Sequence, residues 1–219
     1  MNHTSASTPV SVPVLFENPD LLICEKPAGV ECEHDLPALL QSQLGLPVYA
    51  VHRLDQNVGG LMVYAKTRPA AASLARLMEE KGTPGEAPGI RKEYVALCHG
   101  CPEQEGDGPW TLTDLLFKDP KKNKVFVVRS VRRGVREARL RYTVKWSEED
   151  RALVRITLDT GRSNQIRVQF ASRHCPLFGD HKYGARDEYT APFLYACRLV
   201  IPWKGQTLDF ERLPPWAVR

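Results

Sequence analysis

Apolar residues recur along the chain mostly in short runs, and such runs are typical of strands. Turn residues separate many of them, such as Asn-Pro-Asp at 18–20 and the acidic segment at 148–150. The segments predicted to be strands are two within 14–24, then 48–54 (leading into Asp55), 61–65, 91–98, 124–131, 138–146, 152–158, 194–202 and 207–210. Strands that follow one another directly along a chain favour antiparallel pairing.

Three segments have helical spacing instead: 36–44, the stretch from Thr67 to Lys81, and a short one after 160–163. The hydroxyl of Thr67 can cap the second helix, and Ile166, Phe170 and Ala171 suit the buried side of the third. Because strands outnumber helices, we predict an α+β domain with a mixed, largely antiparallel central sheet and flanking helices and loops.

Composition bounds the class of protein. A chain of 219 residues can bury one substantial core, so we expect a single domain over residues 14–219. Hydrophobic residues at 42% and charged residues at 26% exclude wholesale disorder. No apolar run approaches the roughly 20 residues that cross a bilayer. Residues 1–13 lack the pattern of a signal peptide, so we expect a flexible arm on a cytoplasmic protein with no membrane partner.

Six cysteines are scattered along the chain, and only Cys98 and Cys101 have the spacing of half a zinc site or of a redox pair. A structural zinc site needs a second pair of closely spaced ligands, and no other such pair occurs. A redox pair should open a helix, whereas residues 94–97 before it have a strand pattern. We therefore interpret these cysteines as inert thiols and expect no metal.

The net charge of +4 says little, but its distribution says more. Residues 118–141 contain ten lysines and arginines against two acids, in a stretch that also carries an apolar strand at 125–128. This pattern is typical of a surface that binds a polyanion, and equally of a hairpin whose cations are simply solvated.

Asp55 lies where a predicted strand meets a turn with glycines, behind His52 and Arg53. Such a position can present an acid to a cleft. On these residues alone, an Asp that caps the turn through local hydrogen bonds is the favoured interpretation.

Five segments together change that interpretation. Lys-Pro-Ala-Gly at 26–29 ends an apolar strand, His-Arg-Leu-Asp stands at 52–55, and Lys-Glu-Tyr stands at 92–94. Thr-Gly-Arg-Ser-Asn-Gln-Ile-Arg follows at 160–167, and Pro-Leu-Phe-Gly-Asp at 176–180 precedes Tyr-Gly at 183–184. In this order they resemble the motifs of the RluA-type RNA pseudouridine synthases, and the resemblance covers about residues 14–215.

The resemblance implies the catalytic fold of these enzymes, with a cleft across the sheet, and isomerisation of a uridine held out of its stack. It makes Asp55 the catalytic carboxylate, as a nucleophile at C1′ or a base at C2′, and Arg167 and Tyr94 its partners. Arg53 matches an arginine that enters the RNA helix where the base has left. We expect no cofactor, no separate S4 domain, a monomer, and ribosomal or transfer RNA as partner. The RNA-binding residues predicted from the motifs and the basic stretch are Arg53, Arg162, Lys121, Lys122, Lys124, Arg132 and Arg133.

The chain departs from the family's pattern at a few positions. Val58 and Gly59 stand where relatives usually have Thr-Ser, Ser163 and Asn164 replace Thr-His, and Leu140 often corresponds to a Thr. The segment 82–89 is longer than usual. These departures bear on efficiency and choice of substrate.

Two alternatives stay open, and Val58, Gly59 and Asn164 are the reason for the first of them. One is an RNA-binding or RNA-folding protein that retains the fold and has lost useful catalysis. The other is a different carboxylate enzyme, such as a glycosidase, in which Asp55 would act with Glu31 or Glu33 at about 5–10 Å.

Overall fold

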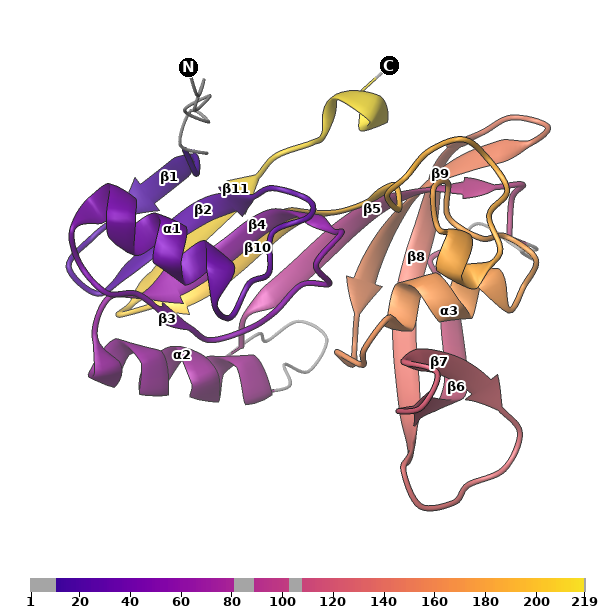
Figure 1. Ribbon diagram of the computed structural model, residues 1–219, viewed down its shortest axis with the longest axis horizontal. Helices are drawn as coiled ribbons and strands as arrows, with labels where there is room; N and C mark the ends of the chain where they lie inside the picture. The colour runs from indigo at the N-terminus through magenta and orange to yellow at the C-terminus, as the bar shows by residue number, and fades with distance from the viewer. Residues whose placement is uncertain (1–10, 81–88, 103–107, 219) are drawn as a thin grey trace, which may run out of the picture.

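A computed structural model describes residues 11–80, 89–102 and 108–218. Within these residues one sheet contains all the strands, in the order β1-β2-β4-β10-β5-β9-β8-β6-β7, with β3 beside β4 and β11 beside β10 (Figure 1). The strands are β1 (Val14–Glu17), β2 (Leu21–Lys26), β3 (Tyr49–Ala50), β4 (Gly59–Ala65), β5 (Arg91–His99), β6 (Trp110–Asp119), β7 (Lys124–Val128), β8 (Val135–Ser147), β9 (Arg151–Leu158), β10 (Leu194–Trp203) and β11 (Gln206–Glu211). Only the contact between β4 and β10 is parallel, so the predicted mixed, largely antiparallel sheet is confirmed.

The helices are α1 (Asp35–Leu44), α2 (Arg68–Glu79) and α3 (Gln165–Ala171), with short 3₁₀ turns η1 (His181–Tyr183) and η2 (Pro215–Ala217). As predicted, α2 begins after Thr67, whose hydroxyl accepts a hydrogen bond of 3.2 Å from the amide of Ala70. Helix α1 packs on the face of β2 and β4 that carries Leu22 and Met62, whereas α2 packs on the opposite face. Because both faces are covered, β4 is buried along its whole length, which explains its unbroken apolar run.

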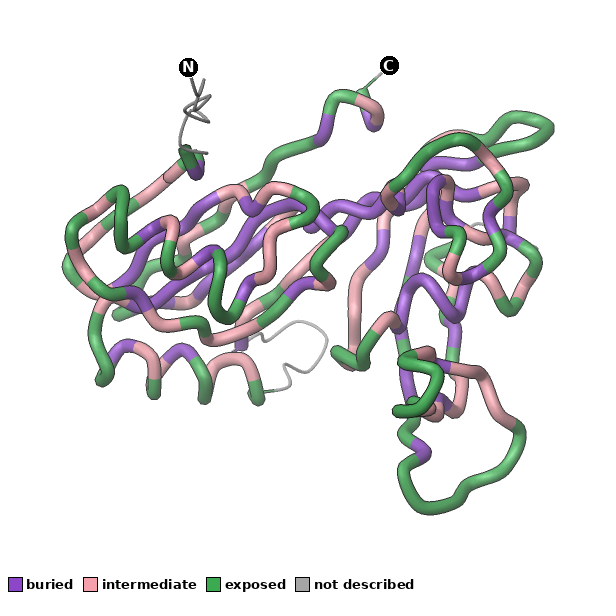
Figure 2. The backbone as a smooth tube through the Cα atoms, viewed as in Figure 1, coloured by how far each residue is buried: buried purple, intermediate pink, exposed green. Residues whose placement is uncertain are grey.

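The central strands are buried, and the loop after β7 is exposed (Figure 2). In Figure 1, β6 and β7 project with this loop from the rest of the sheet, beside α3. The predicted strand at 124–131 ends earlier, at Val128, and residues 129–134 are exposed. Helix α3 buries every residue from Gln165 to Phe170, whereas Ala171, predicted to be buried, is half-buried.

Two further differences concern the ends of predicted segments. The strand predicted for 48–54 has only two residues, because the imidazole of His52, in place of a backbone carbonyl, accepts a hydrogen bond of 3.1 Å from the amide of Val63. Residues 1–10 of the predicted arm at 1–13 lie outside the described residues. Val12 is fully buried and its amide donates to Gln43, so the packed region includes at least this residue. The predicted loop at 82–89 likewise lies outside the described residues up to residue 88.

Gly60 shows how closely the central strands approach one another. It has a φ of +127°, and a Cβ atom built there would lie 2.5 Å from the backbone of Ala196 in β10. No other residue fits this contact without moving the backbone. Gly60 therefore allows β10 to lie against the start of β4, which follows the loop that carries Asp55.

Candidate active site

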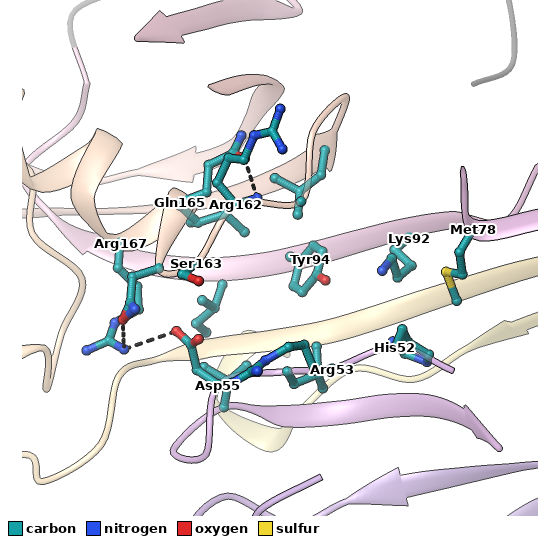
Figure 3. A pocket seen from close by; sticks show the side chains of 17 residues that line it. His52, Arg53, Asp55, Met78, Lys92, Tyr94, Arg162, Ser163, Gln165 and Arg167 are labelled. Carbon is teal, nitrogen blue, oxygen red and sulfur yellow. Dashed lines mark hydrogen bonds and ion pairs between the residues drawn. The ribbon is translucent and has the colours of Figure 1, made fainter. Parts of the chain in front are cut away.

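A pocket of about 380 Å³ opens beside β5, and its size suits a small ligand or one nucleotide (Figure 3). Its walls come from the loop between β3 and β4, from β5, from the end of β9 and from the loop that begins α3. Asp55, Tyr94 and Arg167 all line it, together with Arg53 and Arg162. The structure thus brings the three predicted catalytic residues to one place.

Asp55 is held by a loop that a buried lysine supports. The ammonium of Lys26 is only 1% exposed and donates hydrogen bonds to three backbone carbonyls, including that of Gln56 at 2.8 Å. The amide of Gly29 donates to the same carbonyl. Burial lowers the pKa of Lys26, while nearby acidic groups, among them Asp55, act to raise it. The Lys-Pro-Ala-Gly segment therefore fixes the loop that presents Asp55.

Val58 and Gly59, in the turn that follows Asp55, have no polar side chain. Val58 belongs to the main core and is 2% exposed, and its amide closes a turn on the carbonyl of Asp55 at 2.9 Å. A Cβ atom at Gly59 would lie 3.3 Å from the carbonyl oxygen of Lys26. Backbone hydrogen bonds and core packing support the turn at these two positions, where relatives usually have hydroxyl groups.

Arg167 divides its guanidinium group between two carboxylates. Its Nη1 donates to Asp55 at 3.1 Å, while Nε and Nη2 each donate to Asp180 at 2.7 Å. Burial acts to lower the pKa of Arg167, but the hydrogen bonds and charges of Asp180 and then of Asp55 outweigh it and raise the pKa. The arginine stays charged and keeps one donor aimed at Asp55, whose side chain is 28% exposed.

Asn164 is a further side chain that accepts a hydrogen bond from Arg167. It adopts the left-handed conformation at the start of α3, with φ of 51°, which asparagine tolerates better than most residues. Its carbonyl oxygen accepts a hydrogen bond of 3.0 Å from Nη1 of Arg167. At this position the departure from the family's histidine retains a hydrogen bond to the arginine, although an amide does not carry a proton.

Tyr94 lies in β5 with its ring on the pocket side, between Asp55 and Lys92 in the view of Figure 3. Tyr94 is 5% exposed. Burial raises the pKa of the phenol, and the charge of Asp55 and then of Cys197 raises it further. The hydroxyl group is therefore protonated at neutral pH and can donate a hydrogen bond into the pocket.

The predicted RNA-binding residues fall into two groups. Arg53 and Arg162 line the pocket; Arg53 also pairs with Glu33 on the surface, and Arg162 donates to the carbonyl of Glu137. The other five lie outside the pocket, on the turn between β6 and β7, at the start of β7 and in the loop after it: Lys121, Lys122, Lys124, Arg132 and Arg133. Among the described residues no carboxylate forms an ion pair with any of these five.

Tyr183 connects this hairpin to the pocket. Its hydroxyl group accepts a hydrogen bond of 3.1 Å from the amide of Val125, and its ring lies 5.1 Å from the ammonium of Lys124 and 5.2 Å from the guanidinium of Arg167. Lys182, next to Tyr183 in the chain, lies close enough to the site for its charges to act on it. Burial and then the charge of Arg167 lower the pKa of Lys182, while the charge of Asp55 acts to raise it. Cationic groups therefore run from the hairpin to Asp55.

The glycosidase alternative finds no support in this geometry. The group beside Asp55 is Arg167, and Glu31 accepts backbone amides of its own loop while Glu33 pairs with Arg53. Neither glutamate lines the pocket.

No group of three or more potential metal ligands occurs among residues 11–80, 89–102 and 108–218. Cys98 lies in β5, and burial raises the pKa of its thiol to about 12, which suits an unreactive group. None of the helices that the model describes combines the length and the hydropathy needed to cross a bilayer.

A family model described as RNA pseudouridylate synthase matches residues 20–172. This match includes the Asp55 loop, Tyr94 and Arg167. The chain belongs to the RNA pseudouridylate synthase family. The resemblance of its motifs to that family is thereby confirmed.

Individual relatives agree. The chain is 32% identical to the ribosomal large subunit pseudouridine synthase D of Nitrosomonas europaea, over 96% of this chain and 63% of that protein. It is 30% identical to the ribosomal large subunit pseudouridine synthase C of Buchnera aphidicola, over 85% of this chain and 58% of that protein. It thus spans less than two thirds of the length of either relative.

Solved structures support the fold of the chain. The human RNA pseudouridylate synthase domain containing 4 superposes with a TM-score of 0.75 at 22% identity, covering 94% of this chain and 90% of that one.

Asp180 is a residue that the sequence did not single out. It lies within the segment Pro-Leu-Phe-Gly-Asp, yet only the structure shows its carboxylate, 1% exposed, bound to Arg167. The contact could not be predicted from the spacing of the two residues, because the chain turns between them and they do not lie on one face of a helix. Lys26, Lys92 and Tyr183 likewise lie within the motifs, and their residue types alone do not indicate a role.

Proposed function

We propose that this protein isomerises a specific uridine to pseudouridine in structured RNA, with Asp55 as the catalytic carboxylate. The observation that carries the proposal is the hydrogen bond from Arg167 to Asp55, because it orients a partly exposed carboxylate in a pocket of nucleotide size. The reaction breaks the bond from C1′ to N1 of uracil, turns the base and joins C1′ to C5. The proton on C5 is lost and N1 gains one.

Asp55 can act in two ways in this scheme. As a nucleophile it would attack C1′ and hold the sugar while the base turns; as a base it would remove a proton at C2′. Tyr94, protonated and in the pocket wall, would stack on the uracil or donate a hydrogen bond to it, while the proton from C5 would leave to water. Arg167 would act through its contact with Asp55, as a positioning residue.

The RNA would bind along the cations that lead from the hairpin to the pocket. Phosphate contacts from Lys121, Lys122, Lys124, Arg132 and Arg133 would supply affinity. Arg162 would contact the RNA at the pocket, and Arg53, whose side chain is 66% exposed, would occupy the space that the target base leaves in its helix. We expect the protein to act as a cytoplasmic monomer.

Ribosomal RNA and transfer RNA are both candidate substrates. The two relatives named for the large ribosomal subunit make ribosomal RNA the first one to test. In the test, purified protein is incubated with ribosomal and transfer RNA, and pseudouridine is detected by mass spectrometry. We expect wild-type protein to form pseudouridine and Asp55→Asn to form none while it retains RNA binding. Full activity of Asp55→Asn would contradict the assigned role.

The second candidate is an RNA-binding or RNA-folding protein with the same fold. Val58 and Gly59, which bring no hydroxyl group to the Asp55 loop, are the observation that favours it. It predicts RNA binding by the wild-type protein together with no pseudouridine in ribosomal, transfer or small RNAs.

A further inference from the structure

The pocket extends beyond Tyr94 to an end formed by Lys92, His52 and Met78 (Figure 3). Lys92 and Tyr94 are two residues apart in β5, so their side chains point to the same face of the sheet, about 7 Å apart along the strand. Arg167 lies at the other end, beside Asp55. The pocket therefore has a cation at each end and Tyr94 between them.

Lys92 has no counter-charge among the described residues, since none of their ion pairs or hydrogen bonds involves its ammonium group. The other cations enclosed in this part of the sheet are satisfied: Lys26 by three carbonyls, Arg155 by Glu93 and Glu211, and Arg167 by two carboxylates. Burial alone lowers the pKa of Lys92. Lys92 is half-buried, and a ligand with a negative charge would offset the cost of removing this cation from part of its water.

His52, which lies beside Lys92 at this end of the pocket, also has a nitrogen without a hydrogen-bond partner in the part of the chain that the structure describes. Its Nε2 accepts the amide proton of Val63, which places the ring proton on Nδ1. Nδ1 is buried and has no partner among the described residues. Burial, and then the charge of Lys92, hold the pKa of His52 well below its usual value, so the ring stays neutral. The side chains of Lys92, His52 and Met78 thus bring a cation and no carboxylate to this end of the pocket, so it fits a group rich in oxygen.

We propose that Lys92 binds a backbone phosphate of the RNA next to the target uridine, at the end of the pocket away from Arg167. The assignment rests on the proposed function, because the uridine would occupy the space beside Tyr94 and Asp55. A compact ammonium group is suited to bind phosphate as a point charge. Its distance of about 7 Å from Tyr94 leaves room for a base on the tyrosine and a phosphate on the lysine.

The test measures binding of a fluorescent eight-residue oligouridylate at 50–300 mM salt. All proteins carry Asp55→Asn to prevent turnover, alone or with Lys92→Met or Lys92→Gln. The control is Lys145→Met, which removes one exposed cation of β8 outside the pocket. Removing a single phosphate contact should weaken binding about tenfold at low salt. It should also reduce the slope of log affinity against log salt by about 0.7.

We expect both Lys92 variants to show these changes and Lys145→Met to show neither. We also expect Lys92→Met to have a higher Tm than its parent without RNA, because it removes an enclosed charge that lacks a partner. A folded Lys92 variant with unchanged affinity and slope overturns the assignment. If Lys92→Met does not fold, the same outcome for Lys92→Gln decides the question.

Failure of the proposed function looks different. Wild-type protein is assayed in parallel for pseudouridine formation in ribosomal and transfer RNA. Pseudouridine formation together with unchanged salt slopes would show that only the role of Lys92 is wrong. No pseudouridine from the wild-type protein, with the slopes shifted as expected, would contradict the enzymatic function and leave Lys92 as an RNA-binding residue.

Discussion

Arg167 holds Asp180 through two parallel hydrogen bonds of 2.7 Å, one from Nε and one from Nη2. This pairing leaves Nη1 for Asp55. One cation is thus fixed by a buried carboxylate that faces no solvent and is presented to a second one that faces the pocket. The precision of the Asp55 contact depends on a residue that lies behind the site.

Asp180→Asn should therefore damage both stability and activity. The amide keeps part of the hydrogen bonding but leaves Arg167 buried with less negative charge, and breaking such a pair costs about 3 kcal/mol of the free energy of unfolding. We expect a loss of that size in urea denaturation, and a fall in the rate of pseudouridine formation because Arg167 is no longer held toward Asp55.

The matched control is Asp159→Asn. Asp159 also pairs with two arginines, Arg139 and Arg141, but on the surface, where such pairs contribute about 0–1 kcal/mol. A loss for Asp180→Asn no larger than for Asp159→Asn would contradict the anchoring role.

His52 should make stability depend on pH. Its pKa is held well below the usual value in the folded protein, whereas the unfolded chain takes up a proton near pH 6.5. Below pH 6.5 the unfolded chain therefore binds more protons at His52 than the folded protein does. The free energy of unfolding is highest above that pH and decreases as the pH falls from 6.5 toward the pKa of His52 in the folded protein. The expected loss from this residue between pH 7.5 and 5.5 is about 1.4 kcal/mol.

His52→Gln retains an acceptor for the Val63 amide and does not titrate. Urea denaturation at pH 7.5, 6.5 and 5.5 should show a weaker pH dependence for this variant than for the wild-type protein. His34→Gln changes an exposed histidine and should leave the dependence as it is. Equal pH dependence for wild-type and His52→Gln would contradict the prediction.

Tyr183→Phe should loosen the basic hairpin. The substitution keeps the ring between Lys124 and Arg167 and removes the acceptor for the Val125 amide, which is then buried without a partner at a cost of about 1–3 kcal/mol. We expect faster hydrogen exchange at Val125 and weaker RNA binding. Tyr189→Phe, on the same loop but 43% exposed, serves as the control, and an exchange rate at Val125 that is the same in both variants would count against the link.

Most of the sheet followed from the sequence, because its strands are apolar runs between clear turns. Strand β6 was missed for a physical reason. Its inward-facing positions include Asp114, which accepts hydrogen bonds from Gln169 and Arg173 and so interrupts the apolar alternation. The strand predicted at 48–54 was too long. The amide of Val63 donates to the imidazole of His52 and not to a backbone carbonyl, and no pattern in the local sequence indicates that a side chain is the acceptor.

The site was predictable only in part. Asp55 and Arg167 are 112 residues apart, and residue types alone favoured a turn cap at Asp55. The motifs suggested that the two belong together, and the structure places them in contact. The roles of Asp180 and Lys92 depend on what surrounds each side chain in three dimensions, and a linear pattern does not contain that information.

The position of β10 has a consequence for biosynthesis. Among the described strands, β10 alone joins β4 to β5 in the order of the sheet, yet it follows both of them, as well as Arg167, along the chain. A nascent polypeptide can therefore carry Asp55, Tyr94 and Arg167 before the strand that joins β4 to β5 has emerged. A chain that ends before Leu194 would hold these three residues without the strand that lies between β4 and β5 in the sheet, so the pocket can close only late in synthesis.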